Sequence, residues 1–202
     1  MSQARCTTTL QVASRAFGSE LNFTSLFNQS NFYFTAPNGV MATSFRFGWN
    51  HPFGRTAQFA PGQTQQLPAT ERYFAGGSTT LRGFSLDEAR PHDLKNPHTG
   101  EKVYLEGGNV MTIGNIEYRV PLRTVAGSPL GGALFYDTGN VFPSMSAIHL
   151  REFTHTTGFG LRYQTPVGAA RLDFGINLKP GIRLDGTRES RLKVFFTLGN
   201  PF

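Results

Sequence analysis

Apolar side chains occupy every second position of the stretch Arg171-Leu172-Asp173-Phe174-Gly175-Ile176-Asn177-Leu178. Polar or small residues fill the positions between them. Successive side chains of a β-strand point to opposite faces, so a period of two indicates a strand with two unlike faces. The stretch therefore predicts one strand that is apolar on one side and polar on the other.

The same alternation recurs along the chain from about residue 40 onward. Two weaker runs lie near residues 4–13 and 20–36. Together they predict an all-β fold of about eight antiparallel strands, most near the ~9–11 residues that a tilted membrane strand needs. The apolar positions of the other clear runs are Phe45, Phe47 and Trp49; Ile116, Tyr118, Val120 and Leu122; Leu134, Tyr136 and Phe142; Phe159, Leu161 and Tyr163; and Leu192, Val194, Phe196 and Leu198.

Two architectures explain this alternation. A transmembrane β-barrel turns its apolar face to lipid, whereas a soluble β-sandwich turns it inward. The many aromatic residues on the apolar face and the strand lengths favour the barrel, because soluble strands are usually five or six residues long. The soluble sandwich stays open on periodicity alone.

The composition excludes several other classes of protein. One cysteine among 202 residues excludes a disulfide scaffold and a cysteine-rich zinc module. The net charge is +6, but the basic residues are scattered, so no nucleic-acid partner is predicted. No stretch approaches ~20 consecutive apolar residues, and the first residues lack the apolar region of a signal peptide.

Short and long connections alternate between the predicted strands. The short ones are 37–39, 123–129 and 166–168, and the long ones are 143–152, 180–189 and about 51–108. Outer-membrane barrels have short turns on one side and long loops on the other. A loop of nearly sixty residues also needs a function in a compact domain.

Five motifs follow one another between residue 40 and the C-terminus. They are Leu81-Arg82-Gly83-Phe84 after Gly76-Gly77-Ser78; Gly107-Gly108-Asn109 leading into Asn115-Ile116-Glu117-Tyr118; Phe135-Tyr136-Asp137-Thr138-Gly139; Gly158-Phe159-Gly160-Leu161-Arg162-Tyr163; and Thr165-Pro166-Val167-Gly168 with Arg171-Leu172-Asp173-Phe174-Gly175. In this order they resemble the BamA-type outer-membrane assembly family, with Phe135 and Gly139 in its strand motif.

The resemblance implies that the long loop folds back into the barrel lumen. There Arg82 would meet Glu117 and Asp137, and the alternation independently places both carboxylates on the polar face. Gly83 would let the backbone pass close to the wall, and Phe84 would pack. We call Arg82, Gly83, Phe84, Glu117 and Asp137 the lumen latch. The other interpretation is an exposed turn and a solvated strand residue.

The C-terminus carries a second signal. Phe196, Leu198 and Phe202 share one face with Val194 and resemble the closing-strand signature of outer-membrane barrels, although Asn200 interrupts the series. We expect the closing strand at about 190–202.

The sequence gives no reason to expect catalysis, a metal or a cofactor. None of the five histidines forms the i, i+4 pair with a glutamate that a zinc hydrolase uses. The glycines at 76 and 77 precede no Gly-Lys-Ser/Thr, and no Gly-x-Ser-x-Gly occurs.

The resemblance implies about sixteen strands and preceding periplasmic domains in family members, within the usual range for such barrels. We therefore interpret residues 1–202 as one partial transmembrane β-barrel domain, the C-terminal half, without the substrate-receiving domains. A closed eight-stranded barrel is the alternative, but the long loop would overfill it.

The implied function is insertion of other β-barrel proteins into the bacterial outer membrane. The implied partners are unfolded outer-membrane proteins, outer-membrane lipid and assembly lipoproteins. A passive porin or surface antigen and, less favoured, a soluble β-sandwich binding protein remain the alternatives.

Overall fold

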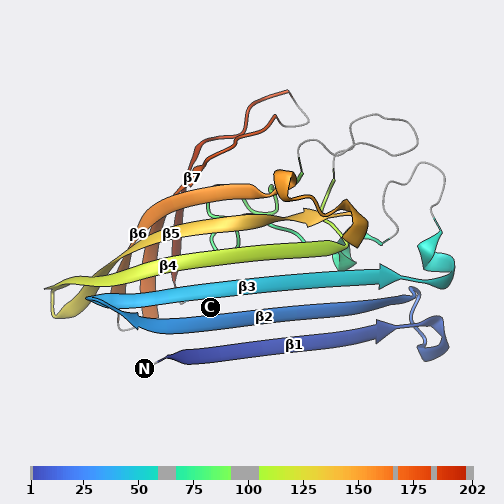
Figure 1. The fold of residues 1–202 in the computed structure, drawn as a ribbon, viewed down its shortest axis with the longest axis horizontal. Helices are drawn as coiled ribbons and strands as arrows, with labels where there is room; N and C mark the ends of the chain where they lie inside the picture. Colours follow the sequence, from blue (N-terminus) through green and yellow to red (C-terminus); the bar gives the residue numbers. More distant parts are fainter. Residues whose placement is uncertain (1, 59–66, 92–104, 166–167, 183–185, 199–202) are drawn as a thin grey trace.

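The computed structural model describes residues 2–58, 67–91, 105–165, 168–182 and 186–198. These residues form one antiparallel sheet in which each strand pairs with its neighbours in the chain (Figure 1). Within the described residues, β1 and β8 each pair on one edge only, so the sheet is not closed. The strands are β1 (Gln3–Ala13), β2 (Phe23–Ala36), β3 (Gly39–Pro52), β4 (Val110–Val125), β5 (Ser128–Phe142), β6 (Thr154–Thr165), β7 (Gly168–Asn177) and β8 (Leu192–Leu198).

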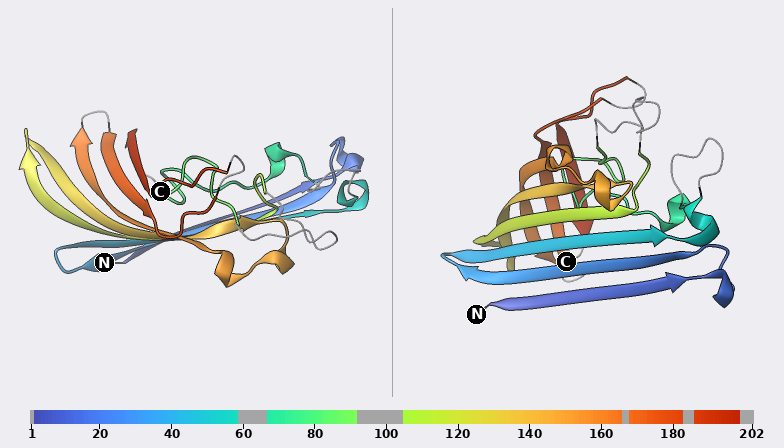
Figure 2. Two further views of the ribbon diagram at one scale, coloured as in Figure 1. Left: turned by 90° about the horizontal axis from the view of Figure 1, so that it is seen from above. Right: turned by 45° about the vertical axis from the view of Figure 1, so that its right-hand side comes forward.

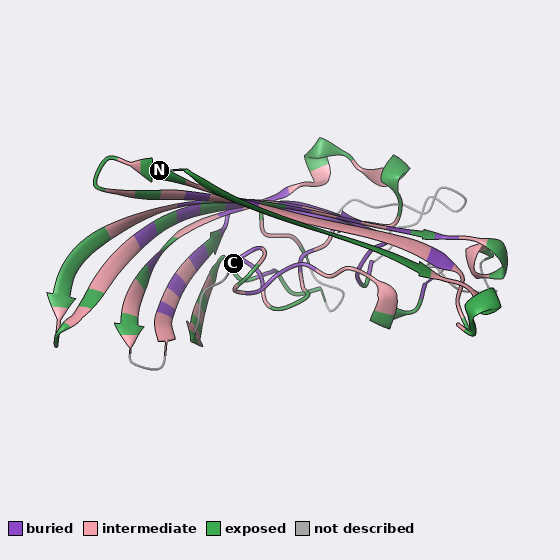
Figure 3. Ribbon diagram, turned by 90° about the horizontal axis from the view of Figure 1, so that it is seen from below, coloured by how far each residue is buried: buried purple, intermediate pink, exposed green. Residues whose placement is uncertain are grey.

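The sheet is curved, and its two faces differ as the alternation predicts. Apolar side chains of the outer, convex face are exposed, with Leu134 at 63% and Phe196 at 68%. Glu117 and Asp137 on the concave face are fully buried. Figure 3 shows buried bands alternating with less buried ones along the strands. An exposed apolar face around a buried polar one is the reverse of a soluble sandwich and fits a wall that meets lipid.

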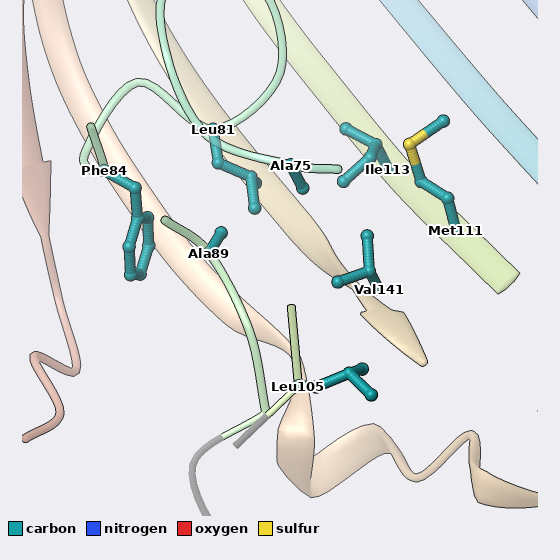
Figure 4. Packing of buried hydrophobic residues seen from close by; sticks show 8 residues of the cluster. All are labelled: Ala75, Leu81, Phe84, Ala89, Leu105, Met111, Ile113 and Val141. Atoms are coloured by element: carbon teal, nitrogen blue, oxygen red, sulfur yellow. The ribbon is translucent and has the colours of Figure 1, made fainter. Parts of the chain in front are cut away.

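The long connection between β3 and β4 lies against the concave face. Its residues 67–91 (green) cross that side of the sheet in both views of Figure 2. They contribute Leu81 and Phe84 to a buried apolar cluster with Ile113 of β4 and Val141 of β5 (Figure 4). The core of this chain therefore lies between the loop and the inner wall.

The connections differ in detail from the predicted ones. The long loop runs from residue 53 to 109, and β4 and β5 extend toward each other until only Ala126 and Gly127 separate them. Both turn residues have positive φ, which suits a two-residue hairpin turn. The turn around residue 166 lies partly outside the described residues.

Phe142 was predicted to face outward with Leu134 and Tyr136, but it is fully buried. The connection after β5 folds back, and the Phe153 ring lies 5.8 Å from the Phe142 ring. The burial of Phe142 was not predicted, because strand periodicity assigns a side chain to a face but cannot show that a loop covers one end of that face. Among the described residues, no helix is long and apolar enough to cross a membrane.

Candidate functional site

Arg82 is the centre of the buried polar network in the lumen. Its Nε and Nη2 donate to the two oxygens of Asp137 at 2.9 and 2.7 Å, which makes a bidentate pair. Its Nη1 donates to Glu117, and its backbone N–H donates to Asp137 Oδ2 at 3.1 Å. Arg82 is only 2% exposed, so these charge-assisted bonds form away from water.

The strand motif from Phe135 to Gly139 and the neighbouring Asn115 surround the Arg82 guanidinium. The Phe135 ring lies beneath the guanidinium, with Arg82 Cζ 3.5 Å from the ring centroid, a cation–π arrangement. Asn115 Nδ2 donates to Asp137 Oδ1 at 2.9 Å. Gly139 has φ +141°, a conformation that L side chains rarely adopt, and a Cβ there would meet β4. The motif thus combines a ring, a carboxylate and a strained backbone position.

Arg82 remains a cation in this network. Burial by itself would lower the pKa of its guanidinium. The hydrogen bonds and charges of Asp137 and Glu117 outweigh that effect and raise the pKa above its ordinary value.

Gly83 lies where the loop backbone touches the wall. A Cβ on Gly83 would be 2.6 Å from Thr156 Cγ2 and 2.9 Å from the backbone N of Asn177. On the facing strand, a Cβ on Gly175 would collide with the carbonyl of Arg82. Two glycines therefore face each other across the loop–β7 contact, and Phe84 beside them is buried in the apolar cluster.

Other side chains of the inner wall hold the carbonyl groups that precede Arg82. Arg46 Nη1 of β3 donates to the carbonyl of Thr79 at 2.5 Å, and Asn115 Nδ2 of β4 donates to that of Thr80 at 2.6 Å. Arg171 Nη2 of β7 lies 3.4 Å from the carbonyl of Ser78. Three successive carbonyls are thus bound by three strands, which fixes the path of the loop.

Glu117 also belongs to a chain of charges along the wall. Arg119 Nε donates to its Oε1 at 2.8 Å, and Arg162 Nη2 lies 3.2 Å from both oxygens. Arg162 and Arg171 each hold one oxygen of Asp173 at 2.5 Å. The sequence analysis predicted no role for Arg119, Arg162, Arg171 or Asp173 in this network. All four occupy polar positions of the alternating runs, which is the signal that could have found them.

Tyr73 attaches the start of the loop to β2. Its hydroxyl lies 2.9 Å from Ser25 Oγ, and its ring stacks on Phe27 at a centroid distance of 6.2 Å. We expect Tyr73→Phe to lower the free energy of unfolding by about 1 kcal/mol, because it removes the hydrogen bond and keeps the ring. Urea unfolding checks this, and an unchanged midpoint would show that the hydroxyl contributes nothing.

Lys193 of β8 contacts the loop. Lys193 Nζ, on the inner face of β8, is 2.7 Å from Ser85 Oγ and 3.8 Å from Glu88 Oε2. Phe196 and Leu198 of the closing-strand signature point outward and are exposed. Phe202 lies outside the described residues. β8 covers Leu192–Leu198 of the expected 190–202, and residues 199–202 lie outside the described residues.

No group of three His, Cys, Asp or Glu side chains placed to bind a metal occurs in the part of the chain that the structure describes. The arrangement is one of ion pairs and packing. What it can do is hold a loop inside a curved wall.

A family model described as the Omp85 superfamily domain matches residues 4–202. The chain is 28% identical over 137 residues to "Outer membrane protein assembly factor BamA" of Nitratidesulfovibrio vulgaris strain Hildenborough, an alignment that covers 67% of this chain and 16% of that protein. Its fold is similar to the crystal structure of BamA from Haemophilus ducreyi lacking POTRA domains 1–3. The TM-score is 0.67 at 17% identity, with 96% of this chain and 37% of that chain covered. The chain thus spans about a sixth of the curated relative and over a third of the solved one. Because the family model covers nearly the whole sequence, the chain belongs to the Omp85 superfamily of outer-membrane β-barrels.

Proposed function

We propose that this chain takes part in inserting other β-barrel proteins into the bacterial outer membrane. The name of the curated relative, an outer-membrane assembly factor, supports this. The observation that carries the proposal is the position of β8, the last described strand, which pairs with β7 and contacts the long loop between β3 and β4, here called the latch loop, through Lys193. An open strand edge can hydrogen-bond an incoming strand, so insertion needs no reacting side chain.

The partners of this activity are unfolded outer-membrane proteins, which would pair with the edge, and the surrounding lipid, which meets the convex face. Assembly lipoproteins are further proposed partners. The lumen latch has a supporting role, because it holds the loop against β4, β5 and β7 while the edge of β8 exchanges partners.

The test is a folding assay with the full-length protein in lipid vesicles. An unfolded β-barrel protein is diluted from urea, and its folding is followed by heat-modifiable migration in gels. We expect folding several-fold faster than with vesicles that contain a passive porin. Ion conductance with no acceleration of folding would instead assign the chain to a passive channel.

A substitution of Lys193 tests whether the loop restrains β8, the closing strand. We expect Lys193→Met to increase hydrogen–deuterium exchange of the β8 amides several-fold, because the strand loses its contact with Ser85 and Glu88. The ion pair is partly exposed, so global stability should fall by about 1 kcal/mol or less.

The matched control is Arg191→Met, which removes an exposed cation just before β8. Equal exchange in both variants and in the unaltered protein would show that Lys193 does not restrain the strand.

A further inference from the structure

The connection between β5 and β6, Pro143–Phe153, leans to the convex side of the sheet. It contains the short turns η4 (Met145–Ala147) and η5 (Leu150–Glu152). Figure 2 (left) shows these turns (gold) on the side of the sheet opposite to the latch loop (green). We call this connection the rim loop, since it extends from the end of the wall that carries the long loops.

The rim loop is attached firmly at its base. Asn140 Nδ2 donates to the carbonyl of Glu152 at 2.6 Å, and the Phe153 ring covers Phe142. The loop is thus held against the outside of the wall by side chains of β5.

The rim loop and the end of β7 present apolar side chains that remain exposed among the described residues. Leu150 is 80% exposed, and Met145 and Leu178, which follows β7, are about half exposed. The backbone N–H of Leu178 donates to the carbonyl of His155 at 3.0 Å, which brings the end of β7 beside the start of β6. These side chains continue the apolar convex face of the strands to its outer rim.

Cations lie directly beside these apolar side chains. Arg151 is exposed, and Lys179 Nζ donates to the backbone carbonyl of Arg151 at 3.4 Å, so the Lys179 ammonium lies against the rim loop. Glu152 is the acidic residue of the rim loop, and its side chain is partly buried. Long cationic side chains reach from apolar surface to polar headgroups, and arginine suits phosphate geometry.

We propose that the rim loop binds the phosphate headgroups of the outer leaflet, with Arg151 and Lys179 as the phosphate ligands and Leu150 immersed at the membrane interface. Two observations favour lipid as the partner that covers the rim loop. The surface is continuous with the lipid-facing wall, and its charge is complementary to an anionic headgroup. This inference rests on the membrane location of the barrel and not on its role in assembly.

The experiment places a reporter on the loop. Leu150→Trp is introduced into the full-length protein after Trp49→Phe and the replacement of any other tryptophan by phenylalanine, and the protein is reconstituted in phosphatidylcholine vesicles. The vesicles contain the same mole fraction of bromine-labelled phosphatidylglycerol or of bromine-labelled phosphatidylcholine. Bromine quenches tryptophan only on contact. We expect quenching by both lipids, with the anionic lipid enriched about fivefold or more around the loop, given the attraction of two surface cations.

Arg151→Gln with Lys179→Gln should abolish the preference and leave quenching by labelled phosphatidylcholine unchanged. Arg15→Gln with Arg55→Gln is the matched control, because it removes two exposed cations from other loops, and it should keep the preference. Inorganic phosphate added to the buffer should not remove it. The proposal is overturned if neither lipid quenches, if both quench equally, if free phosphate displaces the anionic lipid, or if the preference survives Arg151→Gln with Lys179→Gln.

Discussion

Replacing Arg82 by alanine should lower the free energy of unfolding by about 3–5 kcal/mol, because it leaves buried carboxylates without their principal cation. Asp137 is affected most, since its remaining partners in the network are the uncharged Asn115 and Thr156. Glu117 keeps Arg119 and Arg162. We expect a lower urea midpoint, weaker heat-modifiable migration and slower insertion of substrate barrels.

The control for this variant is Arg55→Ala, which removes an exposed arginine from the same loop. The pair itself is measured by a double-mutant cycle with Asp137→Ala, in which the second substitution should cost much less once Arg82 is absent. Unaltered migration and insertion in Arg82→Ala would contradict the latch.

Gly83→Ala should have the second largest effect. Its new methyl group would overlap Thr156 and the backbone of Asn177, and the carbonyl of the preceding Arg82 already lies close against Gly175 of the same strand. Overpacking of this kind costs about 1–3 kcal/mol, here at the expense of the Arg82 fork one residue away. The measurement is again the urea midpoint, together with protease cleavage of the loop, which should become faster.

Gly114→Ala provides a matched comparison. A Cβ on Gly114 of β4 would meet its nearest atom, Thr138 Cγ2, at 3.6 Å, which is an ordinary contact. If the two alanine variants were equally stable, the close approach of loop and wall would have no energetic importance.

Strand periodicity was enough to predict the sheet and its faces. Glu117 and Asp137 occupy polar positions of their runs, so their burial inside the wall follows once the apolar face is turned to lipid. The position of Arg82 came from the resemblance alone, because a loop has no repeat from which its path can be read. For the same reason, the contacts of Arg46 and Arg171 with loop carbonyls could not be predicted, although both side chains were on the expected face.

The burial of Phe142 shows a second limit of prediction from strand periodicity. Alternation assigns a side chain to a face, but it does not say whether another segment covers that face. The rim loop does so at the end of β5, and its sequence contains no periodic pattern that would reveal where it folds.

The contacts of the latch loop reach from β3, through Arg46, to β8, through Lys193. In a closed barrel, strand number and stagger fix the radius. A segment tied to both β3 and β8 acts as a cross-brace, so the distance between these two strands would depend on the length and attachment of this internal loop as well as on the pairing of the strands between them.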